Sequence, residues 1–292
     1  MEKRNATVAV VGAGDFIGGE IAKKFAAEGF TVFVGRRQGE KLAPLVKEIE
    51  TAGGKVFGRT LDARKEEEIV SFLGDADKHA PLEVCVFNIG ANVNFPILDT
   101  TERVFRKVWE MACYSGFLAG REAARLMLPR GKGNIFFTGA TASLRGGSGF
   151  AAFASAKFGL RAVAQSMARE LGPKNIHVAH LVIDSSVDTE WVRQLIANRE
   201  GAQAIENLDP NRLMRPAAVA EAYGSSISSR ATPGPSSKKS GRSERNGKGA
   251  DAGGENGSRG LLEMAHRSRI KHKSTMGSKT PPVCRDQDGS CT

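Results

Sequence analysis

The sequence predicts an α/β fold, a doubly wound parallel sheet with helices on both faces. Short runs of apolar and β-branched residues alternate with longer segments that place apolar side chains at helical spacing. The strand segments are apolar throughout, which is typical of strands buried on both faces. This alternation covers the first 223 of the 292 residues. No run suited to a final, seventh strand follows, so we expect that strand to be lacking.

The elements are expected in strict alternation along the chain. The six expected strands are residues 8–11, 31–34, 55–61, 83–87, 134–138 and 177–183. Five helices are expected between the strands. The first begins at residue 17, the second ends at residue 52 and the third begins at residue 66, and the last two span residues 101–128 and 150–171. Beyond the sixth strand, residues 187–208 are expected to form a helical excursion, and Pro216 lies near the first turn of a further helix.

Three glycines, Gly12, Gly14 and Gly18, lie where the first strand turns into the first helix. A backbone without Cβ atoms can approach a pyrophosphate closely, and the helix N-terminus favours negative charge. The strand before the turn and the helix after it supply the context that this motif requires. We therefore expect a dinucleotide site of the Rossmann type, the alternative being a tight turn without a ligand.

The second strand ends in Gly35-Arg36-Arg37. Rossmann proteins that prefer NAD usually carry an acidic residue here for the ribose hydroxyls, whereas guanidinium groups favour a 2′-phosphate. NADP(H) is therefore expected as the cofactor rather than NAD(H). The alternative is that Arg36 and Arg37 belong only to a solvated loop.

Several motifs in chain order resemble those of the short-chain dehydrogenase/reductase family. Gly12 and Gly18 match the outer glycines of its TGxxxGxG fingerprint, with Phe16 at the middle glycine. Asp62 matches an adenine-contacting aspartate, and Phe87-Asn88-Ile89-Gly90 stands in for an NNAG segment. The cofactor-binding residues expected in all are Gly12, Gly14, Phe16, Ile17, Gly18, Arg36, Arg37, Asp62, Asn88, Gly90, Lys157 and Thr189.

The resemblance also implies a reaction, hydride transfer to or from a small-molecule carbonyl or alcohol substrate. In this family a tyrosine, four residues before a lysine on the same helix, exchanges a proton with the substrate oxygen. Lys157 matches the lysine, but Phe153 stands at the tyrosine position, Ala140 at the serine position and Cys113 at the asparagine position. A phenyl ring cannot donate a proton, so catalysis is expected to be weak or lost. A non-catalytic NADP-binding or scaffold protein is the alternative.

Other side chains could replace the missing groups. Tyr114, Asp184 and His180 are candidate acids, although a structural role is the stronger expectation for each. Thr138 and Thr141 flank Ala140 and could offer a hydroxyl. Lys157 itself is expected to bind the nicotinamide ribose hydroxyls rather than to act in catalysis.

The composition divides the chain into a body, residues 1–223, and a basic tail, residues 224–292. The tail contains no Phe, Trp or Tyr, Gly and Ser supply 24 of its 69 residues, and it holds +7 of the net charge of +10. Such a segment has little with which to build a core, so we expect it to be disordered. Nucleic-acid binding through the tail is a further alternative, which we consider unlikely because the tail lacks aromatic side chains for stacking.

The abrupt change at Gly224 also suggests a shifted reading frame. One-base-shifted codons for residues 224–235 can encode Trp-Gln-Leu-His-Gln-Gln-Pro-Arg-Asp-Ala-Trp-Thr, a sequence that would suit a helix end running into a strand. This is a hypothesis, since codon degeneracy leaves most of those choices free.

The remaining expectations concern the surroundings of the protein. Cys85 and Cys113 are expected to be reduced core thiols, and the four cysteines show no metal-ligand spacing. No signal peptide is evident and no apolar run approaches the roughly 18 residues of a membrane span, so we expect a cytoplasmic protein without a membrane partner. The family resemblance implies a homo-oligomer if the C-terminal region is intact.

Overall fold

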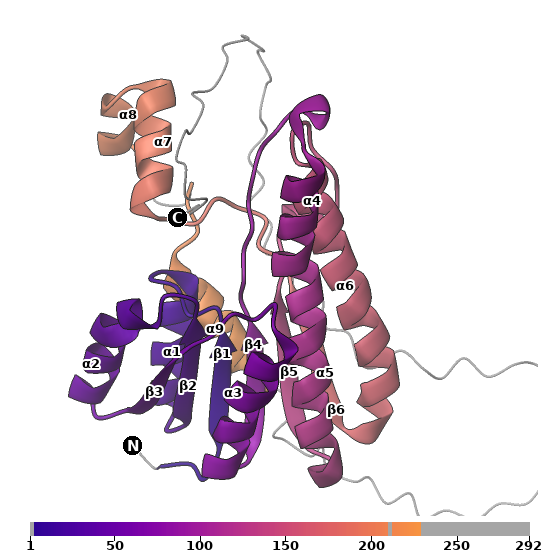
Figure 1. The fold of residues 1–292 in the computed structure, drawn as a ribbon. Coiled ribbons are helices and arrows are strands. Elements are labelled where there is room, and N and C mark those ends of the chain that lie inside the picture. Colours follow the sequence, from indigo (N-terminus) through magenta and orange to yellow (C-terminus); the bar gives the residue numbers. More distant parts are fainter. Residues whose placement is uncertain (1–2, 210–211, 229–292) are drawn as a thin grey trace, which may run out of the picture.

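The computed structural model describes residues 3–209 and 212–228. Its strands form one parallel sheet of six strands in the order β3-β2-β1-β4-β5-β6 (Figure 1). The strands are β1 (Thr7–Val11), β2 (Thr31–Arg36), β3 (Lys55–Thr60), β4 (Leu82–Phe87), β5 (Gly133–Thr138) and β6 (Ile176–Leu181). The predicted doubly wound parallel sheet is therefore confirmed.

The helices cover both faces of this sheet. They are α1 (Ile17–Ala27), α2 (Ala43–Thr51), α3 (Glu66–His79), α4 (Glu102–Trp109), α5 (Ser115–Met127), α6 (Ala151–Leu171), α7 (Glu190–Glu200), α8 (Gln203–Glu206) and α9 (Pro216–Ser228). Residues of α3, α5 and α6 share one core with the sheet, and residues of α1, α2 and α9 share the other. The pair α7 and α8 stands apart from the sheet (Figure 1).

Strand alternation explains why two separate cores form. Successive side chains of a strand point to opposite faces, so Phe136 enters the core under α1 and α9 while Phe137 enters the core under α5 and α6. Both rings are fully buried. Cys85 is buried in the second of these cores, and both it and Cys113 are free thiols, as expected.

The chain is helical over almost all of the expected range 101–128, with one irregularity inside the helix. A π-helical turn at Glu110–Tyr114 separates α4 from α5. Within it, Cys113 faces α6 so closely that a Cβ atom added at Gly159 would lie 2.7 Å from Cys113 Sγ. The extra residue of a π turn does not disturb the apolar spacing enough to be visible in the sequence.

The C-terminal helix α9 crosses the boundary at which the composition changes. It ends at Ser228, five residues beyond Tyr223, and both Gly224 and Ser226 are buried. A Lys24–Glu221 ion pair of 2.7 Å joins α9 to α1. The residues of the expected tail from 229 onward, with Cys284 and Cys291, lie outside the described residues.

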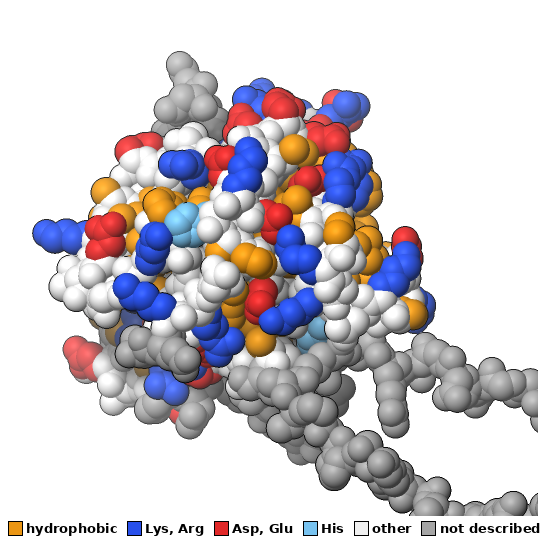
Figure 2. All heavy atoms as spheres, turned by 90° about the horizontal axis from the view of Figure 1, so that it is seen from below, with side chains coloured by type: hydrophobic (Ala, Val, Ile, Leu, Met, Phe, Trp, Pro, Cys, Tyr) orange, Lys and Arg blue, Asp and Glu red, His pale blue; other side chains and the backbone are white. Residues whose placement is uncertain are grey.

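The described surface carries both signs of charge. On the face seen from below Figure 1, Lys and Arg side chains are interspersed with Asp and Glu side chains and with small apolar areas (Figure 2). Over residues 3–209 and 212–228, no helix has the length and apolar character that crossing a membrane requires.

Candidate functional site

The turn between β1 and α1 is built around two glycines that have no room for a side chain. Gly12 has a φ of 93°, and a Cβ atom there would lie 2.9 Å from the carbonyl oxygen of Asn88. A Cβ atom on Gly18 would collide with the carbonyl oxygen of Gly12. At Gly14, by contrast, a Cβ atom would meet nothing within 4 Å. The turn is thus tightly packed on its inner side and open around Gly14.

Phe16 immediately precedes α1, and Ile17 is the first residue of the helix. The Phe16 side chain is 44% exposed, so it points away from the packed interior of the turn. The first amides of a helix have no intrahelical acceptor and are available to an anion. The backbone at the start of α1 therefore offers an anion site despite the bulky residue at the middle glycine position.

The end of β2 presents positive charge beside this turn. Arg36 Nη1 forms an ion pair of 2.6 Å with Asp15 Oδ1, a residue of the glycine turn. Arg37 is exposed. Sequence reasoning missed Asp15. An acidic residue in the glycine turn, with Arg36 and Arg37 at the end of the neighbouring strand, could have indicated this ion pair. The pair holds the Arg36 guanidinium against the turn.

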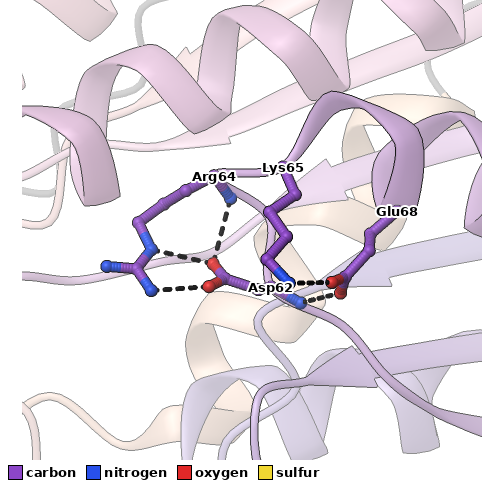
Figure 3. Close-up of polar contacts among 4 residues, drawn as sticks. All are labelled: Asp62, Arg64, Lys65 and Glu68. Atoms are coloured by element: carbon purple, nitrogen blue, oxygen red, sulfur yellow. Dashed lines mark hydrogen bonds and ion pairs between the residues drawn. The ribbon is translucent and has the colours of Figure 1, made fainter.

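Asp62 follows β3 and is fixed by a compact set of polar contacts (Figure 3). Its carboxylate accepts from Arg64 Nε at 2.8 Å and from Arg64 Nη2 at 2.5 Å. Its backbone amide donates to Glu68 Oε2, and Glu68 also pairs with Lys65. The hydrogen bonds from Arg64 lower the pKa of Asp62, which keeps the carboxylate charged.

Asn88 and Gly90 lie just after β4, next to the glycine turn. Asn88 Nδ2 donates to the carbonyl oxygen of Gly12 at 3.1 Å, and Asn88 Oδ1 accepts from Thr138 Oγ1 at 2.9 Å. Gly90 is exposed, and a Cβ atom there would meet nothing within 4 Å. Asn88 thus ties β4 to the turn and to β5.

Lys157 lies on α6 with its ammonium group inside the protein. Only 3% of the residue is exposed, and Nζ donates to the carbonyl oxygens of Thr138 at 2.9 Å and Ile89 at 3.2 Å. Burial lowers the pKa of Lys157 to about 8, so the side chain is mostly protonated at neutral pH. An ammonium carries three hydrogens, so one remains for a further acceptor.

The other three positions expected around Lys157 are apolar or weakly polar. The Phe153 ring centroid lies 5.9 Å from Lys157 Nζ. Phe153 and Cys113 belong to one buried apolar cluster, against which Ala140 packs. Burial raises the pKa of Cys113, an effect that the nearby Lys157 charge partly offsets. The structure therefore brings the four positions together, with a single charged group among them.

The hydroxyl groups beside Ala140 are already engaged. Thr138 Oγ1 contacts Asn88 and the Tyr223 hydroxyl, the latter at 2.8 Å. Thr141 Oγ1 donates to Asp184 Oδ1 at 2.6 Å. Both hydroxyls thus serve contacts within the protein.

Among the described residues, none of the candidate substitute acids forms a hydrogen bond with Lys157 Nζ, which donates to the backbone carbonyl oxygens of Thr138 and Ile89. Tyr114 packs beside Trp109 and Phe117 and lines a surface hollow with Arg64. His180 lies in β6, buried, and its ring nitrogens have no hydrogen-bond partner within the described part of the chain. Burial lowers the pKa of His180 to about 4, so the ring is neutral near pH 7. A neutral buried imidazole cannot supply a proton as a cation.

Thr189 precedes α7 and caps it, since Thr189 Oγ1 accepts from the Val192 amide at 3.2 Å. Nearby, Asp188 pairs with Arg193 at 2.6 Å. Thr189 is thus fixed by the start of α7, in the segment that follows β6.

Comparisons with known proteins identify relatives of this chain. A family model described as short chain dehydrogenase matches residues 6–200. L-2,3-butanediol dehydrogenase of Corynebacterium glutamicum is 30% identical over 192 residues, which are 64% of this chain and 74% of that protein.

Solved structures give the same result. The crystal structure of a short-chain dehydrogenase from Rhodopseudomonas palustris is 68% identical, with a TM-score of 0.65 over 76% of this chain and 91% of the other. A variant of actinorhodin polyketide ketoreductase, crystallised with NADPH, is 26% identical, with a TM-score of 0.70 over 77% of this chain and 91% of the other. From the fold, the glycine turn and these matches, the chain belongs to the short-chain dehydrogenase family.

Proposed function

We propose that this protein binds NADP(H) and transfers hydride to or from a carbonyl or alcohol substrate, with a reaction slowed by the loss of its general acid. The observation that carries the proposal is the glycine turn with Arg36 and Arg37 beside it. The ketoreductase structure with NADPH supports the same cofactor. L-2,3-butanediol dehydrogenase supports, by its name, an alcohol substrate.

The residues present fit a dinucleotide. The open space at Gly14 and the free amides at the start of α1 suit a pyrophosphate. Arg36, already paired with Asp15, and the exposed Arg37 suit a 2′-phosphate. Asp62 suits a contact with adenine, and Lys157 has one hydrogen left for a ribose hydroxyl. Gly90 and Thr189 are proposed to complete the site on the nicotinamide side.

The chemistry follows from what surrounds Lys157. Bound NADPH supplies the hydride. Neither Phe153 nor Ala140 can donate a hydrogen bond to a substrate oxygen. Lys157 Nζ donates two of its hydrogens to backbone carbonyl oxygens. The proton for a developing alkoxide must then come from solvent, which is slower than transfer from a positioned acid.

A cofactor titration tests the proposal. We expect purified full-length protein to bind NADPH at least about tenfold more tightly than NADH, because two guanidinium groups contact the additional phosphate. Arg37→Ala should weaken NADPH binding about tenfold and leave NADH binding unchanged. The matched control is Arg106→Ala on α4, an exposed arginine paired with Glu102, which should change neither affinity. Equal affinity of the unaltered chain for both cofactors would contradict the assignment to NADP(H).

A second candidate, a non-catalytic NADP-binding protein, is favoured by the apolar groups at three positions around Lys157. A panel of carbonyl compounds decides between the two candidates. Cofactor binding without any NADPH oxidation over the panel would favour the non-catalytic protein, whereas slow oxidation of an activated carbonyl would favour the enzyme.

We also infer a homo-oligomer. Phe105 and Trp109 of α4, Phe117 of α5 and Phe158 of α6 are each roughly 40% exposed, and large exposed apolar side chains mark contact surfaces. Sedimentation of the full chain should show a dimer or larger assembly that Phe117→Asp weakens. A monomer at all concentrations would contradict it.

A further inference from the structure

Tyr223 is a buried tyrosine to which neither the fold nor the reaction gives a role so far. It lies on α9 with 2% of its surface exposed, and its ring stacks on Phe136 of β5 with the centroids 5.4 Å apart. Burial raises its pKa, so the hydroxyl stays protonated and can donate. A buried tyrosine hydroxyl requires a partner, and here it meets Thr138 Oγ1 at 2.8 Å.

The direction of the hydrogen bonds from Tyr223 is fixed by chemistry. Asn88 Nδ2 must face the carbonyl oxygen of Gly12, which only accepts, so Asn88 Oδ1 faces Thr138. That amide oxygen also only accepts, so the single Thr138 hydroxyl hydrogen goes to Asn88. Tyr223 is therefore the donor to Thr138, and one continuous chain of donors runs from Tyr223 through Thr138 and Asn88 to Gly12.

This chain ends at the peptide that shapes the glycine turn. The Gly12 carbonyl oxygen accepts from Asn88 Nδ2 and also from the Gly14 amide at 3.0 Å. The same oxygen lies where a Gly18 side chain would be. The orientation of the Gly12 carbonyl consequently sets the path of the backbone into α1, where the amides proposed to receive the pyrophosphate lie.

We infer that Tyr223 is a positioning residue for the cofactor turn, acting through Thr138 and Asn88. Hydrogen bonds in a chain polarise and orient one another. Without the Tyr223 hydroxyl, Thr138 Oγ1 loses its donor, the Thr138–Asn88 contact weakens, and the Gly12 carbonyl is held less firmly. The effect on cofactor affinity rests on the proposed function, whereas the effect on the turn does not. α9 then contributes to the cofactor site through this chain of hydrogen bonds.

Tyr223→Phe tests this inference, because it removes the hydroxyl and keeps the ring. We expect the Kd for NADPH to rise about fivefold, the effect of one hydrogen bond. Amide hydrogen exchange at residues 12–18 of the cofactor-free full chain should accelerate by a similar factor. Thr138→Val should likewise raise the Kd and accelerate the exchange. Thr138→Ser keeps the hydroxyl, so its Kd and exchange rate should match those of the unaltered chain.

Thr7→Val is the matched control. Thr7 is fully buried at the start of β1, and its hydroxyl donates to the Ala80 carbonyl oxygen at 3.2 Å, away from the glycine turn. We expect this variant to lower the unfolding midpoint and to leave both the NADPH affinity and the exchange at residues 12–18 unchanged. A Tyr223→Phe protein that behaves like Thr7→Val would overturn the inference, since Tyr223 would then only stabilise the core.

The exchange experiment also separates this inference from the proposed function. If the unaltered chain binds neither NADPH nor NADH, while Tyr223→Phe still accelerates exchange at residues 12–18, the proposed function fails and the positioning role stands. If the cofactor binds normally and Tyr223→Phe changes neither affinity nor exchange, the positioning role fails and the proposed function stands.

Discussion

Phe153 and Lys157 lie one helical turn apart on α6, and together they decide what the site can do at the scale of single residues. Lys157 holds its ammonium group on two backbone carbonyls, and neither contact involves the side chain at position 153. A phenyl ring supplies packing and lies 5.9 Å from that charge, but it offers no proton. Binding and chemistry are therefore separable here, because they depend on different side chains of the same helix.

Restoring the two hydroxyls should restore the reaction. We expect Phe153→Tyr combined with Ala140→Ser to raise kcat/KM for carbonyl reduction by about 10²- to 10⁴-fold, the usual contribution of a positioned general acid. Oxidation of NADPH measures it. Ala162→Ser, which adds a hydroxyl at an exposed position of the same helix, is the control and should leave the rate unchanged. No gain in the double variant would mean that more than the hydroxyls is lost.

His180 should make the fold sensitive to acid. Its pKa of about 4 in the folded chain lies below the ordinary 6.5, because burial and the charges of Lys157 and Arg161 disfavour the cation. Between these two values the unfolded chain binds the proton and the folded chain does not, so stability is lost as the pH falls from 6.5 to 4. The loss is on the order of 3 kcal/mol.

Denaturation at a series of pH values measures this loss. His180→Leu should flatten the dependence of the unfolding free energy on pH between 6.5 and 4. Parallel curves for the unaltered chain and His180→Leu would show that His180 does not titrate in this window.

At the scale of elements, the turn between β1 and α1 was predictable because its requirements are local. Three glycines between an apolar strand and an amphipathic helix suffice to indicate a tight turn at a helix N-terminus. The π-helical turn between α4 and α5 was not predictable, because the same residues suit one straight helix. Its position is decided by packing against α6, where Cys113 lies close to Gly159.

The glycines of the turn should differ in their tolerance of a methyl group. Gly18→Ala places Cβ against the Gly12 carbonyl oxygen and 2.7 Å from Ala13 Cα, so backbone must move. We expect a loss of about 1 to 3 kcal/mol in unfolding free energy. Gly14→Ala meets nothing within 4 Å and should change stability by less than about 0.5 kcal/mol. Equal losses would contradict the packing described for Gly18.

At the scale of the whole molecule, the C-terminal end of the described chain supports the sheet. β6 pairs with β5 and, among the described strands, has no neighbour on its other side. An open edge with unpaired amides and carbonyls is a site for association with other chains. The buried part of α9 beyond Tyr223 shows that the change in composition at Gly224 is not a change in packing.

A chain with the shifted frame restored from residue 224 should be more stable. A Cβ atom at position 224 would first meet the flexible ends of Lys24 and Glu28, which can move aside. If the restored residues cover the edge at β6, the thermal midpoint should rise by several degrees, since each kcal/mol corresponds to roughly 2–4 °C in a chain of this size. Equal midpoints would contradict the hypothesis, as would an intact reading frame in the coding DNA.

Four features could be predicted from the sequence alone: the six strands, the glycine turn, the two arginines after β2, and the replacement of the tyrosine by Phe153 before Lys157. Each depends on residues that are neighbours in the chain, and spacing along the chain reports such features directly. Asp62, Asn88 and Lys157 could likewise be named from motifs, although their roles toward a cofactor remain proposals.

The contacts between distant segments became visible in the folded chain. Folding placed Asp15 on Arg36, left the His180 ring nitrogens without a hydrogen-bond partner among residues 3–209 and 212–228, and brought the Tyr223 hydroxyl to Thr138, 85 residues earlier in the chain. The physical reason is that burial and hydrogen bonding depend on which faces of the sheet and helices meet, and no local pattern encodes that pairing. The chain of hydrogen bonds that ends at Gly12 is consequently visible only in the folded protein.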